Sequence, residues 1–497
     1  MRPLICEAET ALTPELLVGQ LLNFKSRGHH FNIVLLRSNG DSHSGRYSFL
    51  AANPFLTFRS FGSRCEISHG PGPGADWVQF GNPWQALNAL MSRFELLDEM
   101  DLPFPLGGCF GFWGYDLKNF TEPKLPRRAL NDLELPDCHV GFYDSVVVFD
   151  HHIGKTFVVS TGLEADGSRS ERRAHERLEA WKTRMQNSRY PTEAEIHDIE
   201  PSRALLREVS SNCSRENFVS MVRRAQEYIR AGDIYQVNLS HRLAAESSIS
   251  GWEFFQRLNA VSPAPFAAWL DCGDFQIASS SPEQFLRMSG SHIVTRPIKG
   301  TRPRDAEPTR DAQLAFELRT SAKELAELVM ITDLLRNDAG KICEYGSVQT
   351  TDLAKLEKFT HVQHLVSTVE GRLRRNVTHF AALASCFPGG SITGAPKFRA
   401  MEIIDELERV SRGPYCGCHG YIGFNRESQL SITIRTATRA RENIYFNVGA
   451  GIVADSDPQL EFEETIAKAQ GFLEGFKNPA SFKRTAPQAS ASCSLPR

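Results

Sequence analysis

A single lysine, Lys299, stands in the stretch TRPIKGTRPR (295–304), where two prolines and a glycine prevent a regular helix or a central strand. Such a segment is either a basic surface turn or a loop that holds an amine against a ligand. A lysine amine is nucleophilic only when neutral, which requires burial or nearby cations to lower its pKa. Arg296, Arg302 and Arg304 are the cations that the same stretch could supply.

Two pairs of glutamates are spaced so that each pair shares one face of a helix. Glu324 and Glu327 lie three residues apart in SAKELAELVM, and Glu461 and Glu464 do so in LEFEETIAKA. If the two helices meet, their carboxylates form an oxygen-rich site of the kind that binds Mg²⁺ and bridges it to an anionic substrate. Glu327 and Glu464 each also have a lysine four residues away. Solvated salt bridges are therefore the alternative, and spacing alone favours them.

The stretch CFPGGSITGAPK (386–397) combines glycines and hydroxyls at the start of an expected helix. Free backbone N–H groups at a helix start attract anions, and a proline is favourable there. Ser391, Thr393 and Gly394 would then face a carboxylate or phosphate, with Lys397 beside them. The residue order of a Walker loop is absent. An ordinary glycine-rich turn explains the same residues equally well.

Further candidates lie on expected strands. Gly449 and Gly451 in NVGAGIVADSDP leave backbone N–H groups open to an anion, or simply form a bulge. Arg435 alternates with apolar neighbours in SITIRTA, and an inward arginine needs an anionic partner such as a carboxylate. His364 either donates to a substrate oxygen or is a satisfied core histidine, which is commoner. Together these residues predict a site for a small anion with more than one carboxylate, a metal and a lysine.

The elements that must position these residues are strand meanders and long helices. A helix is expected from the N-cap Ser214 to Gly232, a long one over 309–336, and a last one over about 458–475. Because the strands do not alternate with helices as in βαβ units, the predicted class is α+β with antiparallel sheets. The expected strands include DIYQVNLSHRL, PFAAWLD, FQIASSSPEQFLR, SHIVTRPI, QLSITIRTATRA and NIYFNVGAGIV.

The chain of 497 residues is too long for one small core. Residues 1–195 are mixed and strand-rich, and the polar stretch NSRYPTEAEIHDIEPSR is typical of a linker. Residues 205–476 form the better patterned half. Residues 477–497 contain few large apolar side chains, so we expect a disordered tail.

Composition excludes several classes of protein. Hydrophobic residues make up 41% and charged residues 23%, and the net charge of −3 gives no basic field for nucleic acid. The sequence contains no run of 18 apolar residues, so no membrane span is predicted. The first residues do not have the pattern of a signal peptide. Eleven cysteines without disulfide-framework or zinc-ligand spacing predict reduced thiols in a cytoplasmic protein.

A set of motifs fills the second half of the chain: YQVNLSHR, SSSPEQF, PIKGTRPR, AELVMITDLLRND, HLVSTVEG, FPGGSITGAPK, IRTA, GAGIVADSDP and EETIAKA. This set resembles the chorismate-utilising enzymes, which include anthranilate synthase component I, aminodeoxychorismate synthase component I, and isochorismate and salicylate synthases. The resemblance is strong over residues 205–475. It extends to the N-terminal subdomain of the first two members through LLRS (35–38) and GGCFGFWGYD. It implies two packed antiparallel β-sheets with outer helices and an active site between the sheets.

Within that family, a P-I-K-G-T loop is typical of lysine-type aminodeoxychorismate synthases, whereas anthranilate synthases have P-I-A-G-T or similar. The resemblance implies that Lys299 attacks C2 of chorismate while the C4 hydroxyl leaves. Ammonia then attacks C4 and expels the lysine, giving 4-amino-4-deoxychorismate for p-aminobenzoate and folate. Glu283 in SSSPEQF would protonate the leaving hydroxyl. Gln236 stands where isochorismate and salicylate synthases have a water-activating lysine, which argues against those activities.

The resemblance also implies the other site residues. Glu327 and Glu464 would bind Mg²⁺, with Glu324 and Glu461 acting through water, and His364 would face the reacting ring. The residues expected to bind substrate are Gln236, Thr301, Ser391, Thr393, Gly394, Lys397, Arg435, Gly449 and Gly451.

No cysteine stands at a strand-to-helix elbow with a downstream His–Glu pair, so we expect a separate glutaminase subunit to supply ammonia from glutamine. Anthranilate synthase component I is the alternative enzyme, which Lys299 disfavours. The alternative outside enzymes is a non-catalytic partner that binds tryptophan, which the complete set of candidate catalytic residues disfavours. In relatives an N-terminal pocket binds tryptophan, and Ser38 and Arg46 are the residues expected to form it here.

Overall fold

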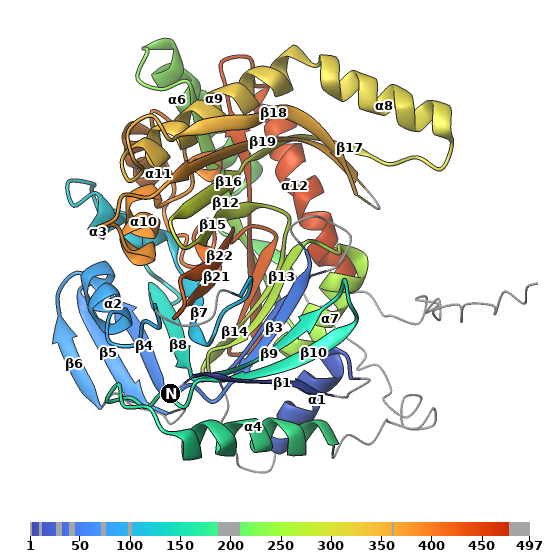
Figure 1. The fold of residues 1–497 in the computed structure, drawn as a ribbon. Coiled ribbons are helices and arrows are strands. Elements are labelled where there is room, and N and C mark those ends of the chain that lie inside the picture. The colour runs from blue at the N-terminus through green and yellow to red at the C-terminus, as the bar shows by residue number, and fades with distance from the viewer. Residues whose placement is uncertain are drawn as a thin grey trace, which may run out of the picture.

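The computed structural model describes residues 2–8, 12–25, 32–38, 45–70, 76–97, 102–186, 209–359 and 362–476. Within these ranges the chain forms two large antiparallel sheets with helices packed around them (Figure 1). The prediction of an α+β fold with two antiparallel sheets is confirmed. No helix within the same ranges is long and apolar enough to cross a lipid bilayer.

Each sheet has twelve strands in the described part of the chain. In hydrogen-bonded order the first sheet contains β1 (Leu4–Ala8), β10 (Lys155–Ser160), β9 (Ser145–Asp150), β3 (Tyr47–Ala52), β2 (Ile33–Arg37), β13 (Phe266–Asp271), β14 (Phe275–Ser281), β23 (Thr436–Ala440), β24 (Asn443–Ile452), β12 (Gln236–Glu246) and β11 (Val209–Ser211), with β20 (Gly394–Ala395) also paired to β12. The second contains β17 (Ile298–Pro303), β19 (Val362–Arg372), β16 (His292–Arg296), β15 (Gln284–Ser289), β22 (Glu427–Ile432), β21 (Cys418–Gly423), β7 (Gly108–Trp113), β8 (Cys138–Tyr143), β4 (Leu56–Phe61), β5 (Arg64–His69) and β6 (Trp77–Phe80), with β18 (Gln349–Lys358) also paired to β19.

Helices surround the sheets, with α8 and α9 at one end of the molecule and α1 and α4 at the other (Figure 1). Their bounds are α1 (Pro14–Lys25), α2 (Pro83–Met91), α3 (Lys118–Thr121), α4 (Glu171–Gln186), α6 (Arg215–Arg230), α7 (Gly251–Val261), α8 (Pro308–Thr320), α9 (Ala322–Gly340), α10 (His379–Cys386), α11 (Lys397–Leu407) and α12 (Pro458–Gly475), with short 3₁₀ turns η1 (Tyr115–Leu117) and η2 (Gly390–Ile392).

The two sheets pack through a buried aromatic and aliphatic core. Phe49 on β3 of the first sheet meets Tyr421 on β21 of the second, with ring centroids 5.0 Å apart in an edge-to-face arrangement. Val148 and Phe110 belong to the same buried cluster. Removal of these apolar faces from water stabilises the contact between the sheets.

The two halves of the chain share both sheets. β2 pairs with β13 in the first sheet, and β7 pairs with β21 in the second. The segment proposed as the linker falls in 187–208, and the proposed tail in 477–497, and both lie outside the described residues.

Local sequence signals predict several helix ends correctly. Ser214 accepts the N–H of Asn217 at the start of α6, and Gly232, at a φ of 82°, follows the end of that helix. α12 spans the predicted 458–475. The prediction of one long helix over 309–336 is wrong. The chain forms α8 and α9 instead, because Ser321 is extended, with a ψ of 106°, and its hydroxyl caps the new helix by accepting the N–H of Glu324.

Candidate functional site

The loop that contains Lys299 forms β17, a bulged edge strand. Lys299 pairs with Leu365 and Thr301 with His364, so Gly300 is an extra residue between two successive pairs. Gly300 has a φ of 69°, and a Cβ atom there would lie 2.7 Å from Leu318 Cδ1 and 3.1 Å from Glu324 Oε2. Only glycine satisfies both conditions, so the bulge that aims Lys299 depends on this residue.

The amine of Lys299 lies among acidic groups in a partly buried position. Its Nζ atom is 3.8 Å from Glu327 Oε2, and the two side chains are 17% and 14% exposed. The same lysine also acts electrostatically on Glu283. The three arginines of the stretch are each paired with a carboxylate: Arg296 with Glu357, Arg302 with Glu324 at 3.6 Å, and Arg304 with Asp311 at 2.8 Å.

Glu283 is a buried acid between β14 and β15. Burial raises its pKa from the ordinary 4.5 to about 7, while the hydroxyl of Ser391, the charge of Lys299 and the backbone N–H of Ile298 oppose that rise. Ser391 lies in η2, so the glycine-rich stretch places a hydroxyl near this acid, where it opposes the rise in pKa. A carboxyl with a pKa near neutrality is suited to donating a proton.

Gln236, the first residue of β12, lies next to Lys299. It is 2% exposed, and its Oε1 atom has no hydrogen-bond partner among the described residues. A Cβ atom on Gly451 would lie 2.5 Å from Gln236 Nε2 and 4.0 Å from Lys299 Nζ, so these three residues are neighbours. A buried amide oxygen without a partner costs free energy unless a ligand or water supplies a donor.

The other residues of the glycine-rich stretch form one wall of the site. Gly394 pairs with Val237, and a Cβ atom there would lie 2.1 Å from the carbonyl oxygen of Gln236. The buried Thr393 hydroxyl donates to the Gly389 carbonyl at 3.0 Å. The ammonium of Lys397 donates to the Asp338 carboxylate and to the carbonyls of Cys386 and Pro388, which accounts for its three N–H bonds. These two side chains are therefore engaged within the protein.

A second wall is formed by β24 and the turn before β23. Arg435 adopts a φ of 50°, and burial lowers its pKa, while Tyr415 and Glu464 act in the opposite sense. A Cβ atom on Gly449 would lie 3.0 Å from the hydroxyl of Tyr415. Tyr415 was not predicted from the sequence. It stands in RGPYCGC, a turn whose side-chain directions no periodicity reveals.

His364 lies beside the bulge. Its Nδ1 atom is 2.9 Å from the Thr301 hydroxyl and 3.4 Å from the Gly300 carbonyl oxygen. Burial lowers the pKa of His364, and the charge of Arg435 lowers it further, while the bond to Gly300 opposes them. The imidazole is therefore neutral near pH 7 and holds the Thr301 side of the loop.

The four glutamates proposed for Mg²⁺ lie on α9 and α12. Their present partners are Arg302 for Glu324, Lys299 for Glu327, Ser456 for Glu461 at 2.6 Å, and Lys468 for Glu464 at 2.7 Å. The salt-bridge alternative is thus formed at Glu464, whereas Glu327 pairs with Lys299 and not with the lysine on its own helix.

These carboxylates fit Mg²⁺ by donor type. Magnesium takes oxygen ligands and is usually held by one or two carboxylates, with waters and substrate completing the shell. Glu461 and Glu464 lie close enough for the charge of Glu464 to raise the pKa of Glu461, after the larger effect of burial, and Lys323 of α9 acts on the same group. Within the described ranges, no group of three or more acidic, histidine or cysteine side chains is placed so that it could hold a metal ion.

The N-terminal residues define a separate pocket between the sheets. Ser38, Tyr47, Phe49, Pro265 and Tyr421 are among its lining residues. Ser38 donates its backbone N–H to Ser48 Oγ at 2.9 Å. Arg46 does not line this pocket; its guanidinium binds Asp150 on β9 at 2.6 Å.

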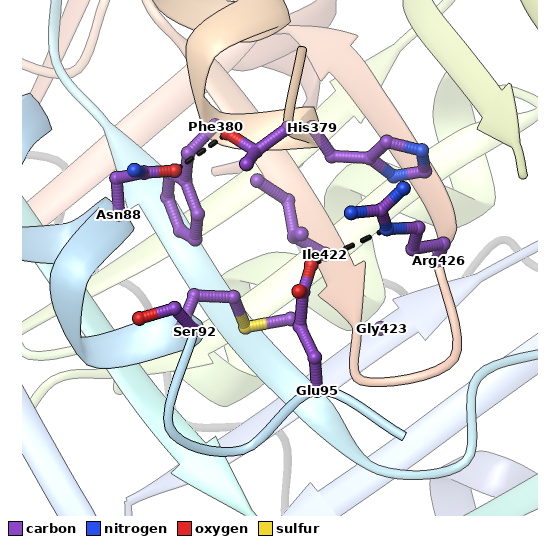
Figure 2. Close-up of a pocket in the computed structure, with 10 residues that line it drawn as sticks. Asn88, Ser92, Glu95, His379, Phe380, Ile422, Gly423 and Arg426 are labelled. Carbon is purple, nitrogen blue, oxygen red and sulfur yellow. Dashed lines mark hydrogen bonds and ion pairs between the residues drawn. The ribbon is translucent and has the colours of Figure 1, made fainter. Parts of the chain in front are cut away.

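Another hollow lies between α2, α10 and the β21–β22 hairpin (Figure 2). Glu95 and Arg426 meet there at 3.4 Å. None of the predicted site residues lines this hollow.

Comparisons with known proteins identify the family of this chain. The profile of the chorismate binding enzymes matches residues 34–474. Anthranilate synthase component 1 of Acetivibrio thermocellus is 38% identical, with 88% of each chain covered. Aminodeoxychorismate synthase component 1 of Escherichia coli (strain K12) is 37% identical over 90% of this chain and 94% of its own.

The crystal structure of anthranilate synthase component I from Streptococcus pneumoniae TIGR4 superposes with a TM-score of 0.75 at 32% identity, covering 87% of this chain and 93% of that one. Relatives with two different products are equally similar, so identity alone does not select the product. The resemblance inferred from the motifs is confirmed at the level of the family: the chain belongs to the chorismate binding enzymes.

Proposed function

We propose that this chain converts chorismate and ammonia to 4-amino-4-deoxychorismate. The observation that carries the proposal is the position of Lys299, whose amine lies beside Gly451 and Gln236 and within the electrostatic reach of the buried acid Glu283. A lysine and a proton-donating carboxyl are the two groups that a covalent displacement at this site requires.

The proposed reaction proceeds in two displacements. After Lys299 releases the proton that it holds in its ion pair with Glu327, its neutral amine bonds to C2 of the ring, and the C4 hydroxyl leaves as water after accepting a proton from Glu283. Ammonia then bonds to C4 and breaks the bond between C2 and the lysine nitrogen. The new ammonium at C4 returns one proton to Glu283, and the freed amine of Lys299 takes up its own proton again, so the sum is chorismate plus ammonia giving aminodeoxychorismate plus water.

Gln236 and the backbone glycines support the choice of nucleophile. The amide of Gln236 cannot remove a proton from water, whereas its unpartnered Oε1 atom can accept a hydrogen bond from ammonia, which is already nucleophilic. The guanidinium of Arg435 suits a carboxylate of the substrate, with the backbone N–H of Gly449 as a further proposed contact, since the Gly449 carbonyl already accepts from Lys468.

Mg²⁺ is part of the proposal. Glu327 and Glu464 would hold it, with Glu324 and Glu461 behind them, and the ion would neutralise a carboxylate of the substrate. The residues of the chain orient the ring and move the protons.

We further propose that a separate glutaminase supplies the ammonia, since both curated relatives above are named as component 1 of their enzymes. The pocket at Ser38 is the proposed site for tryptophan. The ten described cysteines are all free, which suits the reducing cytoplasm in which we propose that the enzyme works.

The product distinguishes this function from the alternative anthranilate synthase. Purified chain is given chorismate, Mg²⁺ and ammonium at alkaline pH, and the products are separated by chromatography and mass spectrometry. We expect aminodeoxychorismate, which becomes p-aminobenzoate only after a lyase is added. Anthranilate formed without any second enzyme would overturn the proposal.

A further inference from the structure

Arg412 is a buried arginine outside the residues considered so far. It follows α11 and is 4% exposed. Its Nε atom donates to Glu408 Oε2 at 2.8 Å, and its Nη2 atom donates to Glu408 Oε1 at 2.7 Å. This fork-like contact within a buried pair fixes the plane of the guanidinium.

The remaining donors of Arg412 reach two backbone carbonyls of the site. Nη1 donates to Ile392 of η2 at 3.0 Å, and Nη2 donates to Asn238 of β12 at 2.7 Å. Ile392 is next to Ser391, whose hydroxyl lies close enough to Glu283 to act on its pKa, and Asn238 lies two residues after Gln236. One side chain thus joins the segment behind the acid to the strand that begins with Gln236.

Two further contacts close the same junction. The N–H of Asn238 donates to the carbonyl of Thr393 at 2.8 Å. Glu408 Oε1 accepts from both the N–H and the hydroxyl of Ser240, at 2.8 and 3.0 Å. Glu408 therefore anchors Arg412 to β12 as well as orienting it, and the carboxylate is satisfied without solvent.

Arg412 also packs against two buried aromatic rings. Its guanidinium carbon is 4.7 Å from the ring centroid of Tyr115 and 5.8 Å from that of Tyr415. The Tyr415 hydroxyl faces Gly449, the residue proposed to contact substrate. Arg412 therefore contacts residues on both sides of the site: the η2 turn and β12 on one side, and Tyr415 on the other.

We infer that Arg412 is a positioning residue that holds the η2 turn against β12, so that the Ser391 hydroxyl stays beside Glu283 during catalysis. Arg412 does not contact the proposed reacting groups, so it acts through the turn. The inference rests on the proposed role of Glu283 as a proton donor, and misplacement of such a group by about 1 Å costs on the order of 10²-fold in rate.

The test compares Arg412→Lys with the control Arg173→Met. Lysine keeps the charge but cannot span the carboxylate and both carbonyls with a planar fork. Arg173 on α4 also bridges a buried carboxylate, Asp144 at 3.1 Å, and a carbonyl, Leu163 at 2.8 Å, at the opposite end of the molecule from α9 (Figure 1). Arg412→Lys replaces the guanidinium fork on Glu408 by a single ammonium, and Arg173→Met removes one of the two arginines that pair with Asp144, so both substitutions are expected to lower the unfolding temperature.

Hydrogen exchange separates positioning from simple destabilisation. In Arg412→Lys the amide of Asn238 and the peptide covering 389–394 should exchange about tenfold faster at a temperature well below unfolding. In Arg173→Met these amides should exchange as in the wild type. Equal protection in both variants would overturn the inference.

Kinetics and a double-mutant cycle complete the test. Arg412→Lys should lower kcat for chorismate with ammonia by about ten- to a hundredfold, with KM changed by less than about threefold. Added to Ser391→Ala, it should cause little further loss, since both act through the Ser391 hydroxyl beside Glu283. Full additivity, or wild-type kcat in folded Arg412→Lys, would refute the inference, whereas a wild-type enzyme that does not turn over chorismate would refute the proposed function.

Discussion

Lys299 and Glu327 face each other across the site, with 3.8 Å between Nζ and Oε2. The proposed nucleophile and a proposed metal ligand thus share one contact. The ammonium of Lys299 and a divalent cation bound at Glu327 would both be attracted to this one carboxylate. The charge of the lysine therefore affects how tightly the metal binds.

The first prediction concerns the nucleophile. Lys299→Ala should reduce aminodeoxychorismate formation with ammonia by at least about 10³-fold, because no other amine lies at that point of the bulge. Lys299→Arg should fail equally, since a guanidinium stays protonated. Circular dichroism checks the fold, and Lys355→Ala, an exposed lysine on β18, serves as the control. Retention of wild-type turnover in Lys299→Ala would exclude the covalent route.

A second prediction follows from the shared carboxylate. Lys299→Met removes a cation beside Glu327 and should strengthen metal binding by a few-fold, in line with about 1 kcal/mol for a partly exposed ion pair. Calorimetry with Mg²⁺, or electron paramagnetic resonance with Mn²⁺, measures this without catalysis. An unchanged or weakened affinity would mean that the metal does not use Glu327.

The proposed metal ligands give the third prediction. Glu327→Gln and Glu464→Gln should each raise the Mg²⁺ concentration needed for half-maximal activity by about tenfold or more, because a neutral amide is a poorer ligand for a hard cation. Glu463→Gln is the matched control, since Glu463 lies beside Glu464 on α12 but pairs with Arg215 at 2.8 Å. A shift of the same size in the control would assign the effect to helix charge.

The fourth prediction uses the pKa of Glu283, which burial raises to about 7. The folded state binds this proton more tightly than the unfolded state, so its contribution to stability falls as pH rises from 4.5 to about 7. In Glu283→Gln the side chain does not ionise, so this loss of stability with rising pH is absent. Relative to the wild type, its free energy of unfolding should increase by up to about 3 kcal/mol between these pH values, as measured by denaturant titration.

The same group predicts the alkaline limb of activity. Glu283 donates its proton only while protonated, so turnover at a constant concentration of free ammonia should decline as pH rises through about 7. Glu283→Gln should lose about 10² to 10⁴ in kcat and show no such limb. A wild-type profile that stays flat from pH 6 to 9 would argue against this acid.

The fifth prediction concerns the source of ammonia. The chain alone should use ammonium but not glutamine, and addition of a glutaminase subunit should enable glutamine use. Burial raises the pKa of Cys65 and of Cys343 to about 11, whereas a catalytic thiol has a lowered pKa. Turnover with glutamine in a preparation free of any second polypeptide would contradict this prediction.

Much of the fold could be predicted where local signals and periodicity agree. The caps at Ser214 and Gly232 and the bounds of α12 depend on a few neighbouring residues. The break at Ser321 could not be predicted, because helical periodicity continues on both sides of it and only the packing of α8 and α9 against β17 distinguishes them.

The site follows the same distinction. Lys299, Glu283 and Gln236 could be selected because their types and motifs limit their chemistry. The contacts of these residues could not be predicted from the sequence. Gln236 and Gly451, for example, are 215 positions apart and meet only through the pairing of β12 with β24. For the same reason Lys397 was expected at the substrate, whereas its ammonium is bonded to Asp338 and two carbonyls.

The exchange of strands between the two halves also constrains synthesis of the chain. β2 cannot pair with β13, and β7 cannot pair with β21, until the later strand of each pair has been synthesised. Neither sheet is therefore complete until most of the polypeptide has left the ribosome. Until then β2 and β7 present unpaired hydrogen-bonding edges, which favour association with other chains. A nascent or truncated N-terminal half should therefore need a chaperone to remain dispersed, while the complete chain should not.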